Sequence, residues 1–252
     1  MDSTKRFSDR VDDYRKYRPG YPFEIINLLN EKCGLTKNST VADVGSGTGI
    51  LTGLLLPHAG LVYAVEPNDA MRKAAEDDLS RYASFRSING TAELTTLPDC
   101  TVDLICAAQA FHWFDRGRAK IEFLRIAKKG AWTVLIWNDR STENNDFQAA
   151  YETFLKEHIP GYGNVTHKNI DDTIVSDFYA PEPFEKYLMK HAQQFEFDSL
   201  LGRLRSSSYA PKEYHEHYDV VVQELRRIFD AYNVNGRVVF EYCTNVFIGK
   251  TA

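Results

Sequence analysis

The chain has 252 residues, of which 43% are hydrophobic and 13% aromatic, so a sizeable core is expected and global disorder is excluded. A formal net charge of -5 at pH 7 disfavours a dedicated nucleic-acid-binding protein, because such proteins are usually basic. No apolar run approaches the roughly 20 residues of a membrane-spanning helix, and the charged N-terminus lacks an apolar signal-peptide core. Four scattered cysteines without a CxxC pair indicate a reduced, cytoplasmic protein.

The first 137 residues alternate apolar strands with amphipathic helices. A polar N-terminus leads into a Pro-rich elbow at 17–22, and the apolar spacing of 23–33 predicts a helix that ends at Gly34. Five strands are expected after it, at 40–44, 61–65, 85–88, 102–107 and 132–137, with helices between them at 51–56, 70–82 and 115–128. This alternation predicts βαβ units and a parallel, doubly wound sheet.

The pattern changes after residue 137. Residues 138–182 are polar and aromatic, with an irregular centre at 160–164, and a strand is expected at 184–197. Pro211 is expected to open a helix that runs to about Tyr232, and 238–248 is the final strand. The fold class predicted from this pattern is α/β: a doubly wound, Rossmann-like, mostly parallel seven-stranded sheet with an antiparallel edge strand and a partly helical cap.

The chain is predicted to be a single domain with four parts. An N-terminal cap (1–39) precedes a cofactor-binding core (40–137), a variable substrate-side region (138–235) and the final strand (236–252). In a doubly wound sheet the ligand lies at the carboxyl ends of the strands. Residues that directly follow the strands are therefore the candidates for a binding site.

A glycine turn, GSGTG, follows the first strand. Gly45, Gly47 and Gly49 alternate along it, a pattern that brings bare backbone up to a ligand. A dinucleotide fingerprint has Gly or Ala at its sixth position, where this chain has Ile50, and the lack of a following Lys-Ser/Thr pair excludes a P-loop. The alternative for this stretch alone is a tight turn that binds no ligand.

Carboxylates follow the second and third strands. Glu66 can accept hydrogen bonds from both hydroxyls of a ribose, and Pro67 directly after it fixes its position. The alternative for Glu66 is a solvated surface side chain. Thr91-Ala92-Glu93 can meet the edge of an adenine ring, with an ordinary acidic loop as the alternative. Together with the glycine turn, these residues favour an adenosine-type ligand.

An aromatic run, Gln109-Ala110-Phe111-His112-Trp113-Phe114, follows the fourth strand. At least one of its three apolar aromatic side chains is expected in the core, and the others are expected to form a wall of the ligand crevice. His112 has two interpretations, a histidine satisfied within the core and a side chain that faces the ligand.

These motifs in this order, DVGSGTG, VEP, GTAE and AAQAFHWFD, together resemble the class I S-adenosylmethionine-dependent methyltransferases. Within them the chain resembles the small-molecule group of methyltransferase type 11 that includes trans-aconitate methyltransferase-like enzymes. The resemblance extends from the YRKYRPGYP elbow to the final FEYCTNVFIGK strand. It implies S-adenosyl-L-methionine as cofactor and methyl transfer to a small-molecule acceptor, with carboxylic acids among the acceptors, by direct in-line displacement.

The resemblance also implies a role for each motif. The glycine turn would approach the methionine part of the cofactor with Asp43 near its amino group, and Glu66 would hold the ribose hydroxyls. Tyr14 and Arg18 would close over the cofactor from the N-terminal elbow. The implied cofactor-binding residues are Tyr14, Arg18, Asp43, Gly45, Ser46, Gly47, Thr48, Gly49, Glu66, Pro67, Asn68, Met71, Thr91, Ala92, Glu93, Gln109, Ala110 and Phe111.

Candidates for the acceptor side are fewer. His112 is the candidate general base for a hydroxyl or nitrogen acceptor, whereas a carboxylate acceptor needs no base. Trp113, Trp137 and Arg205 are expected on the substrate side, and Arg205 with Arg203 is either an anion clamp or part of a solvated helix face. No metal site is expected, because the side chains of the histidines at 215 and 217 would point apart on the predicted helix.

Two other functions remain open from the sequence. One is a nicotinamide-dependent Rossmann oxidoreductase, which Ile50 and the lack of a Tyr-Lys type catalytic pair disfavour. The other is a non-catalytic cofactor-binding protein whose 138–235 region binds a partner. For the methyltransferase, the expected partner is a small-molecule acceptor, without nucleic acid or membrane, and the chain is expected to be a monomer or homodimer.

Overall fold

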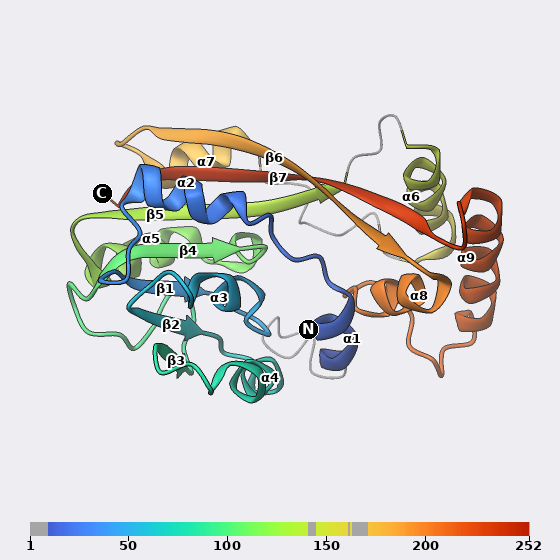
Figure 1. The fold of residues 1–252 in the computed structure, drawn as a ribbon, viewed down its shortest axis with the longest axis horizontal. Coiled ribbons are helices and arrows are strands. Elements are labelled where there is room, and N and C mark those ends of the chain that lie inside the picture. Colours follow the sequence, from blue (N-terminus) through green and yellow to red (C-terminus); the bar gives the residue numbers. More distant parts are fainter. Residues whose placement is uncertain (1–9, 141–144, 161, 163–170, 252) are drawn as a thin grey trace.

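The computed structural model describes residues 10–140, 145–160, 162 and 171–251. Its centre is a seven-stranded sheet with the order β3-β2-β1-β4-β5-β7-β6 (Figure 1). The strands are β1 (Thr40–Val44), β2 (Leu61–Val65), β3 (Phe85–Ile88), β4 (Val102–Ala108), β5 (Ala127–Arg140), β6 (Phe184–Phe195) and β7 (Val238–Lys250). The predicted Rossmann-like, mostly parallel sheet is confirmed. Its antiparallel strand, β7, pairs with both β5 and β6, which places it one position in from the edge.

Helices cover both faces of the sheet. One apolar cluster joins β1 to α2 (Glu24–Cys33), α3 (Ile50–Leu55) and α4 (Asp69–Leu79). The other cluster joins the opposite face to α5 (Arg116–Ile126) and α7 (Asp172–Tyr179). Successive β1 residues Val41 and Ala42 belong to the two different clusters, as the alternation of side chains along a strand requires. A strand buried on both faces is mostly apolar, and for this reason the sequence located β1 and β4 well.

A cap is built on the carboxyl side of the sheet, where β5, β6 and β7 extend beyond the shorter strands (Figure 1). It consists of α1 (Val11–Tyr17), α6 (Asp146–His158), α8 (Phe197–Arg205) and α9 (Tyr218–Tyr232). A third apolar cluster, with residues of α6, α8 and α9 and of the adjoining parts of β6 and β7, forms its core. The cap therefore stands directly over the edge of the sheet at which ligands bind in this fold class.

Several boundaries differ from the prediction. Helix α9 begins at Tyr218, after turns and bends at 213–217, so the predicted start at Pro211 is wrong. The histidines at 215 and 217 therefore precede the helix. Helices α1, α6, α7 and α8 were not predicted. Of the predicted irregular centre at 160–164, residues 161, 163 and 164 lie outside the described residues. Among the described residues, none of the helices has the length and apolar character that a membrane span requires.

Candidate active site

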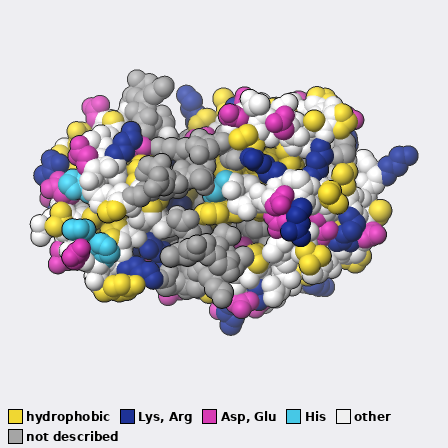
Figure 2. Space-filling model, turned by 180° about the vertical axis from the view of Figure 1, so that it is seen from behind, with side chains coloured by type: hydrophobic (Ala, Val, Ile, Leu, Met, Phe, Trp, Pro, Cys, Tyr) yellow, Lys and Arg dark blue, Asp and Glu magenta, His cyan; other side chains and the backbone are white. Residues whose placement is uncertain are grey.

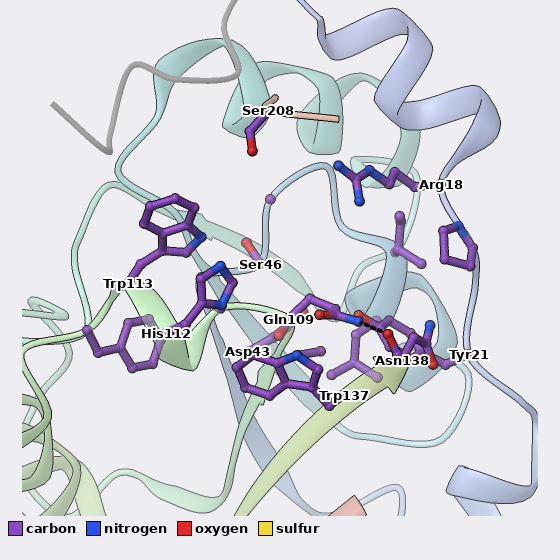
Figure 3. Close-up of a pocket in the computed structure, with 18 of the residues that line it drawn as sticks. Arg18, Tyr21, Asp43, Ser46, Gln109, His112, Trp113, Trp137, Asn138 and Ser208 are labelled. Carbon is purple, nitrogen blue, oxygen red and sulfur yellow. Dashed lines mark hydrogen bonds between the residues drawn. The ribbon is translucent and has the colours of Figure 1, made fainter. Parts of the chain in front are cut away.

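A cavity of about 760 Å³ lies between the carboxyl ends of the strands and the cap. It brings together most of the side chains and turns that the sequence analysis selected. The predicted residues in its wall are Tyr14, Arg18, Asp43, Gly45, Ser46, Gly47, Glu66, Pro67, Asn68, Met71, Thr91, Ala92, Glu93, Gln109, Ala110, His112, Trp113 and Trp137. Arg18 and Ser208, from the cap, lie on the opposite side of this space from Asp43 and Trp137 (Figure 3).

The glycine turn forms the floor of the cavity beside β1. The backbone N–H groups of Gly45 and Ser46 donate to the Val65 carbonyl at 2.9 and 3.1 Å, which ties the turn to the end of β2. Gly45 has a φ of +72°, and a Cβ there would fall 2.5 Å from the Cβ of Ala110. Gly47 also has a positive φ of +58° but has open space around it. The turn therefore combines a close approach to the β4 loop with bare backbone facing the cavity.

Asp43 places a buried carboxyl group at the end of β1. It is 1% exposed, and its Oδ2 accepts a hydrogen bond of 2.6 Å from Thr52 Oγ1. Its Oδ1 has no hydrogen-bond partner within the described part of the chain. Burial raises the pKa of Asp43 to about 7, against the opposing effect of the Thr52 hydrogen bonds. An unpartnered buried carboxylate on a cavity wall is suited to a cationic group.

Glu66 is held rigidly at the end of β2. It is 8% exposed, and its two carboxyl oxygens accept from the backbone N–H of Gly47 at 2.9 Å and of Asn68 at 2.8 Å. Burial raises its pKa, although these two bonds favour the charged form. Each carboxylate oxygen has further acceptor capacity, so Glu66 can also accept from ligand hydroxyls.

The neighbouring turns are also fixed by backbone contacts. Asn68 caps α4 by accepting a hydrogen bond of 3.0 Å from the Met71 N–H. Met71 and Ala92 are buried apolar side chains of the cavity wall. Glu93 accepts a hydrogen bond of 2.8 Å from the Asp115 N–H, which connects the loops that follow β3 and β4. This part of the cavity can hold a flat aromatic group between apolar side chains.

The loop after β4 has an unusual backbone at Gln109. Its φ is +54°, its N–H donates to the Ile136 carbonyl at 2.9 Å, and its Nε2 donates to the Asn138 carbonyl at 2.9 Å (Figure 3). A left-handed conformation in a residue other than glycine is uncommon and is often associated with functional sites.

The imidazole of His112 lies beside two indole rings of the cavity wall. Its ring centroid is 4.6 Å from that of Trp113 and 5.4 Å from that of Trp137. Its ring lies between these two indoles in Figure 3.

Four predicted site residues lie elsewhere. Phe111 is 0% exposed and packs against Phe178 at 4.8 Å between ring centroids, so it is the core member of the aromatic run. Thr48 and Gly49 are turned away from the cavity, and a Cβ on Gly49 would meet the Leu79 side chain at 2.6 Å. Arg205 lies outside the cavity wall and forms an ion pair of 2.9 Å with Glu213.

The N-terminal helix closes the cavity from above. The Arg18 guanidinium lies 4.9 Å from the ring centroid of Tyr14, and its Nη2 donates to the Ser206 carbonyl at 2.9 Å. Helix α1 packs closely on α8, because a Cβ on Gly202 would fall 2.1 Å from the ring of Tyr17.

Arg10 ties the same two elements together. Its guanidinium donates to the carbonyls of Arg205 at 3.2 Å, of Ala210 at 2.7 Å and of Ser207. The start of the described chain is thereby joined to the segment that follows α8.

The cap adds wall residues that the sequence analysis did not assign to the site. They include Arg140, Glu152, Tyr209 and Tyr242. Arg140 ends β5, and the carboxyl ends of parallel strands are where ligands bind in this fold class. Arg203, for which an anion clamp and a solvated helix face were the two alternatives, also lines the cavity. It lies on the buried face of α8, so the solvated helix face is wrong for Arg203.

Comparisons with known proteins find similarity to methyltransferases. Residues 42–135 match the family model described as a methyltransferase domain. An uncharacterized methyltransferase of Mycobacterium tuberculosis is 35% identical over 139 residues, which make up 55% of this chain and 54% of the relative. A probable S-adenosylmethionine-dependent methyltransferase of Saccharomyces cerevisiae is 29% identical over 147 residues, 57% of this chain and 50% of the relative. The chain thus spans about half the length of these curated relatives.

A solved structure extends the likeness to the whole fold. The structure of a putative type II methyltransferase from Anaeromyxobacter dehalogenans has a TM-score of 0.65 and 23% sequence identity. The match covers 93% of this chain and 98% of that protein. The sheet and the cap-side elements together therefore have a counterpart in a known structure.

Proposed function

We propose that this chain, whose residues 42–135 match a methyltransferase domain, transfers a methyl group from S-adenosylmethionine to a small-molecule acceptor. The acceptor class that we propose is the carboxylic acids. The observation that carries the cofactor assignment is that two buried carboxyl groups, those of Asp43 and Glu66, lie in the wall of one cavity beside a glycine turn.

The cavity wall fits the proposed cofactor group by group. The unpartnered Oδ1 of Asp43 suits the ammonium group of its methionine part, and the open space at Gly47 admits that chain along the turn. Glu66, fixed by two backbone donors, suits the ribose hydroxyls, with charge-assisted hydrogen bonds each worth about 1.5–3 kcal/mol. Met71 and Ala92 suit the two sides of the adenine ring.

The reaction demands little acid–base chemistry from the protein. When bound, the cofactor supplies a methyl group that its sulfonium has already activated for displacement. The chain then has to align the acceptor atom with that methyl group and exclude water, and such alignment contributes about 7–11 kcal/mol. The cap, including α1, provides the enclosure. His112, at the wall between two indoles, is placed to accept a proton from a hydroxyl or nitrogen acceptor.

A small acceptor fits the enclosure better than a macromolecule. A volume of about 760 Å³ falls in the range of about 300–1,000 Å³ typical of small-molecule sites. On the rear face, basic and acidic side chains of the described residues are interspersed (Figure 2). This mixture supports the proposal that nucleic acid is not the acceptor, because polyanion-binding surfaces gather basic side chains.

Calorimetry with S-adenosylhomocysteine, the demethylated product, tests the cofactor assignment. We expect a single binding site for it. The Glu66→Ala variant should keep the fold and bind S-adenosylhomocysteine at least about tenfold more weakly. Unchanged affinity in Glu66→Ala would remove the ribose assignment. Absence of binding to a folded sample would remove the proposal itself. A library of acids, alcohols and amines with a labelled methyl donor then tests for transfer, and the absence of product from every class would favour a non-catalytic binding protein.

A further inference from the structure

Three arginines, of which Arg203 is buried and Arg18 and Arg140 are partly buried, line the cap end of the cavity. Arg18 follows α1, Arg140 ends β5 and Arg203 lies on α8, so three distant parts of the chain contribute them. Arg203 is only 7% exposed. Burial of a guanidinium is costly unless an anion or several acceptors compensate it. The convergence of three such groups on one cavity therefore needs an explanation.

The protein itself compensates one of them. Arg140 forms an ion pair of 3.2 Å with Glu152 and donates to the Tyr162 hydroxyl at 2.9 Å. Tyr162 in turn donates to the same Glu152 carboxylate at 2.7 Å. The charge of Arg140 is thus matched by that of Glu152.

Arg203 is not matched in this way. Its Nη1 donates to the neutral Ser207 hydroxyl at 3.1 Å, and its Nε has no hydrogen-bond partner among the described residues. None of the ion pairs within the described ranges includes Arg203. Within the described residues Arg18 likewise donates to a neutral carbonyl, that of Ser206, but the proposed cofactor would offer it the carboxylate of its methionine part. Among the described residues, the buried positive charge of Arg203 therefore has no anion beside it.

Two phenols complete the surroundings of this charge. Tyr209 and Tyr242 both line the cavity, and the Tyr242 hydroxyl, on a side chain 2% exposed, has no partner in the described chain. Burial by itself would raise the pKa of Tyr209, but the Arg140 and Arg203 guanidiniums outweigh it and lower that pKa. The positive potential of the two guanidiniums therefore already favours the ionised form of a neighbouring side chain, Tyr209.

We propose that Arg203, with Arg140 and the Tyr242 hydroxyl, binds the carboxylate of the methyl acceptor. This inference rests on the proposed function and assigns its acceptor specificity to named residues. A planar guanidinium matches a carboxylate in shape and charge, and an unpartnered hydroxyl adds a donor. Because a single positive charge is uncompensated, the site favours a monoanion such as a carboxylate over a phosphate dianion.

The test uses binding to the protein saturated with S-adenosylhomocysteine. The probes are a panel of aliphatic and aromatic monocarboxylates, each paired with its neutral amide, together with methyl phosphate. We expect at least one carboxylate to bind at least about tenfold more tightly than its amide and more tightly than methyl phosphate. Equal affinity of every acid and its amide, or tighter binding of methyl phosphate, would overturn the proposal.

Variants on one helix separate this role from a general effect of charge. Arg203→Met should remove the preference for the acid, Arg203→Lys should restore part of it, and Arg205→Met should leave it unchanged. Arg205 is the matched control because it lies on α8 but outside the cavity wall. An equal loss in Arg205→Met and Arg203→Met contradicts the assignment.

Two further measurements keep the outcomes distinct. Arg203→Met should still bind S-adenosylhomocysteine within about threefold of the unmodified protein, whereas failure of the unmodified protein to bind it would refute the proposed function. If Arg203→Met does not fold, Tyr242→Phe replaces it, since this change removes only an unpartnered hydroxyl. We expect it to weaken carboxylate binding about two- to tenfold, and unchanged binding counts against the proposal.

Discussion

The buried carboxyl of Asp43 should make cofactor binding depend on pH. Its pKa of about 7 means that the group is about nine-tenths protonated at pH 6 and about nine-tenths ionised at pH 8. The ionised form attracts the ammonium group of S-adenosylhomocysteine, and the protonated form does not. We therefore expect the association constant for this product to rise about tenfold between pH 6 and pH 8.

Calorimetry at pH 6, 7 and 8 measures this dependence. Asp43→Asn removes the titrating group with little change in shape, so its affinity should be low and nearly constant, and it also controls for ionisation of the ligand. Thr52→Val removes the hydroxyl that donates to Asp43 Oδ2 at 2.6 Å and favours its charged form. Its binding profile should shift to higher pH.

The same group should reduce the stability of the ligand-free protein as the pH rises. The folded pKa of about 7 lies above the ordinary value of 3.8, so folding favours the protonated form. Its contribution to the free energy of unfolding, at most about 4 kcal/mol, is fully present below about pH 4 and is lost as the pH rises through 7. Denaturant unfolding should show Asp43→Asn more stable than the unmodified protein at pH 8, with a gap that closes towards pH 4.

Either of two results would refute this reasoning. One is an association constant of the unmodified protein that does not change between pH 6 and 8. The other is the same pH dependence in Asp43→Asn, which would assign the linkage to a different group.

Four other substitutions have defined outcomes. Gly45→Ala would place a Cβ 2.5 Å from that of Ala110 and should lower the free energy of unfolding by several kcal/mol. Gly47→Ala, which has open space, should lower it by only about 1–2 kcal/mol. Similar losses for the two variants in denaturant titrations would contradict this. Glu66→Gln should weaken S-adenosylhomocysteine binding at least about tenfold in calorimetry, and a smaller loss argues against two ribose bonds. His112→Gln should lower kcat for hydroxyl acceptors about 10²-fold or more without changing cofactor affinity, and an unchanged kcat excludes His112 as the base.

The parts of the fold that the sequence predicted well are those with a local signal. The strands at 40–44 and 61–65 agree with β1 and β2 because strands buried on both faces are continuous apolar runs. The glycine turn and Glu66 were located because the site of this fold class lies directly after such strands.

The rest depends on contacts between distant segments. Three aromatic residues within Phe111–Phe114 carry the same apolar signal, and only the turn of the backbone there directs Phe111 into the core and leaves Trp113 at the cavity. Strand β5 continues to Arg140 because it pairs with β7, more than 100 residues later, and Asn138 and Asp139 mask this extension in a hydropathy pattern. The cap helices share a core that no single segment reveals.

The contact between α1 and α8 has a consequence for the order of events in the site. Helix α1 leads directly to Arg18, above the proposed cofactor half, and α8 carries Arg203 of the acceptor end. Arg10 and the close packing of Tyr17 on Gly202 tie these two helices to each other. We therefore expect a ligand that orders one half of the site to order the other as well. Each ligand should then bind more tightly in the presence of its companion, which is the signature of one cooperative unit.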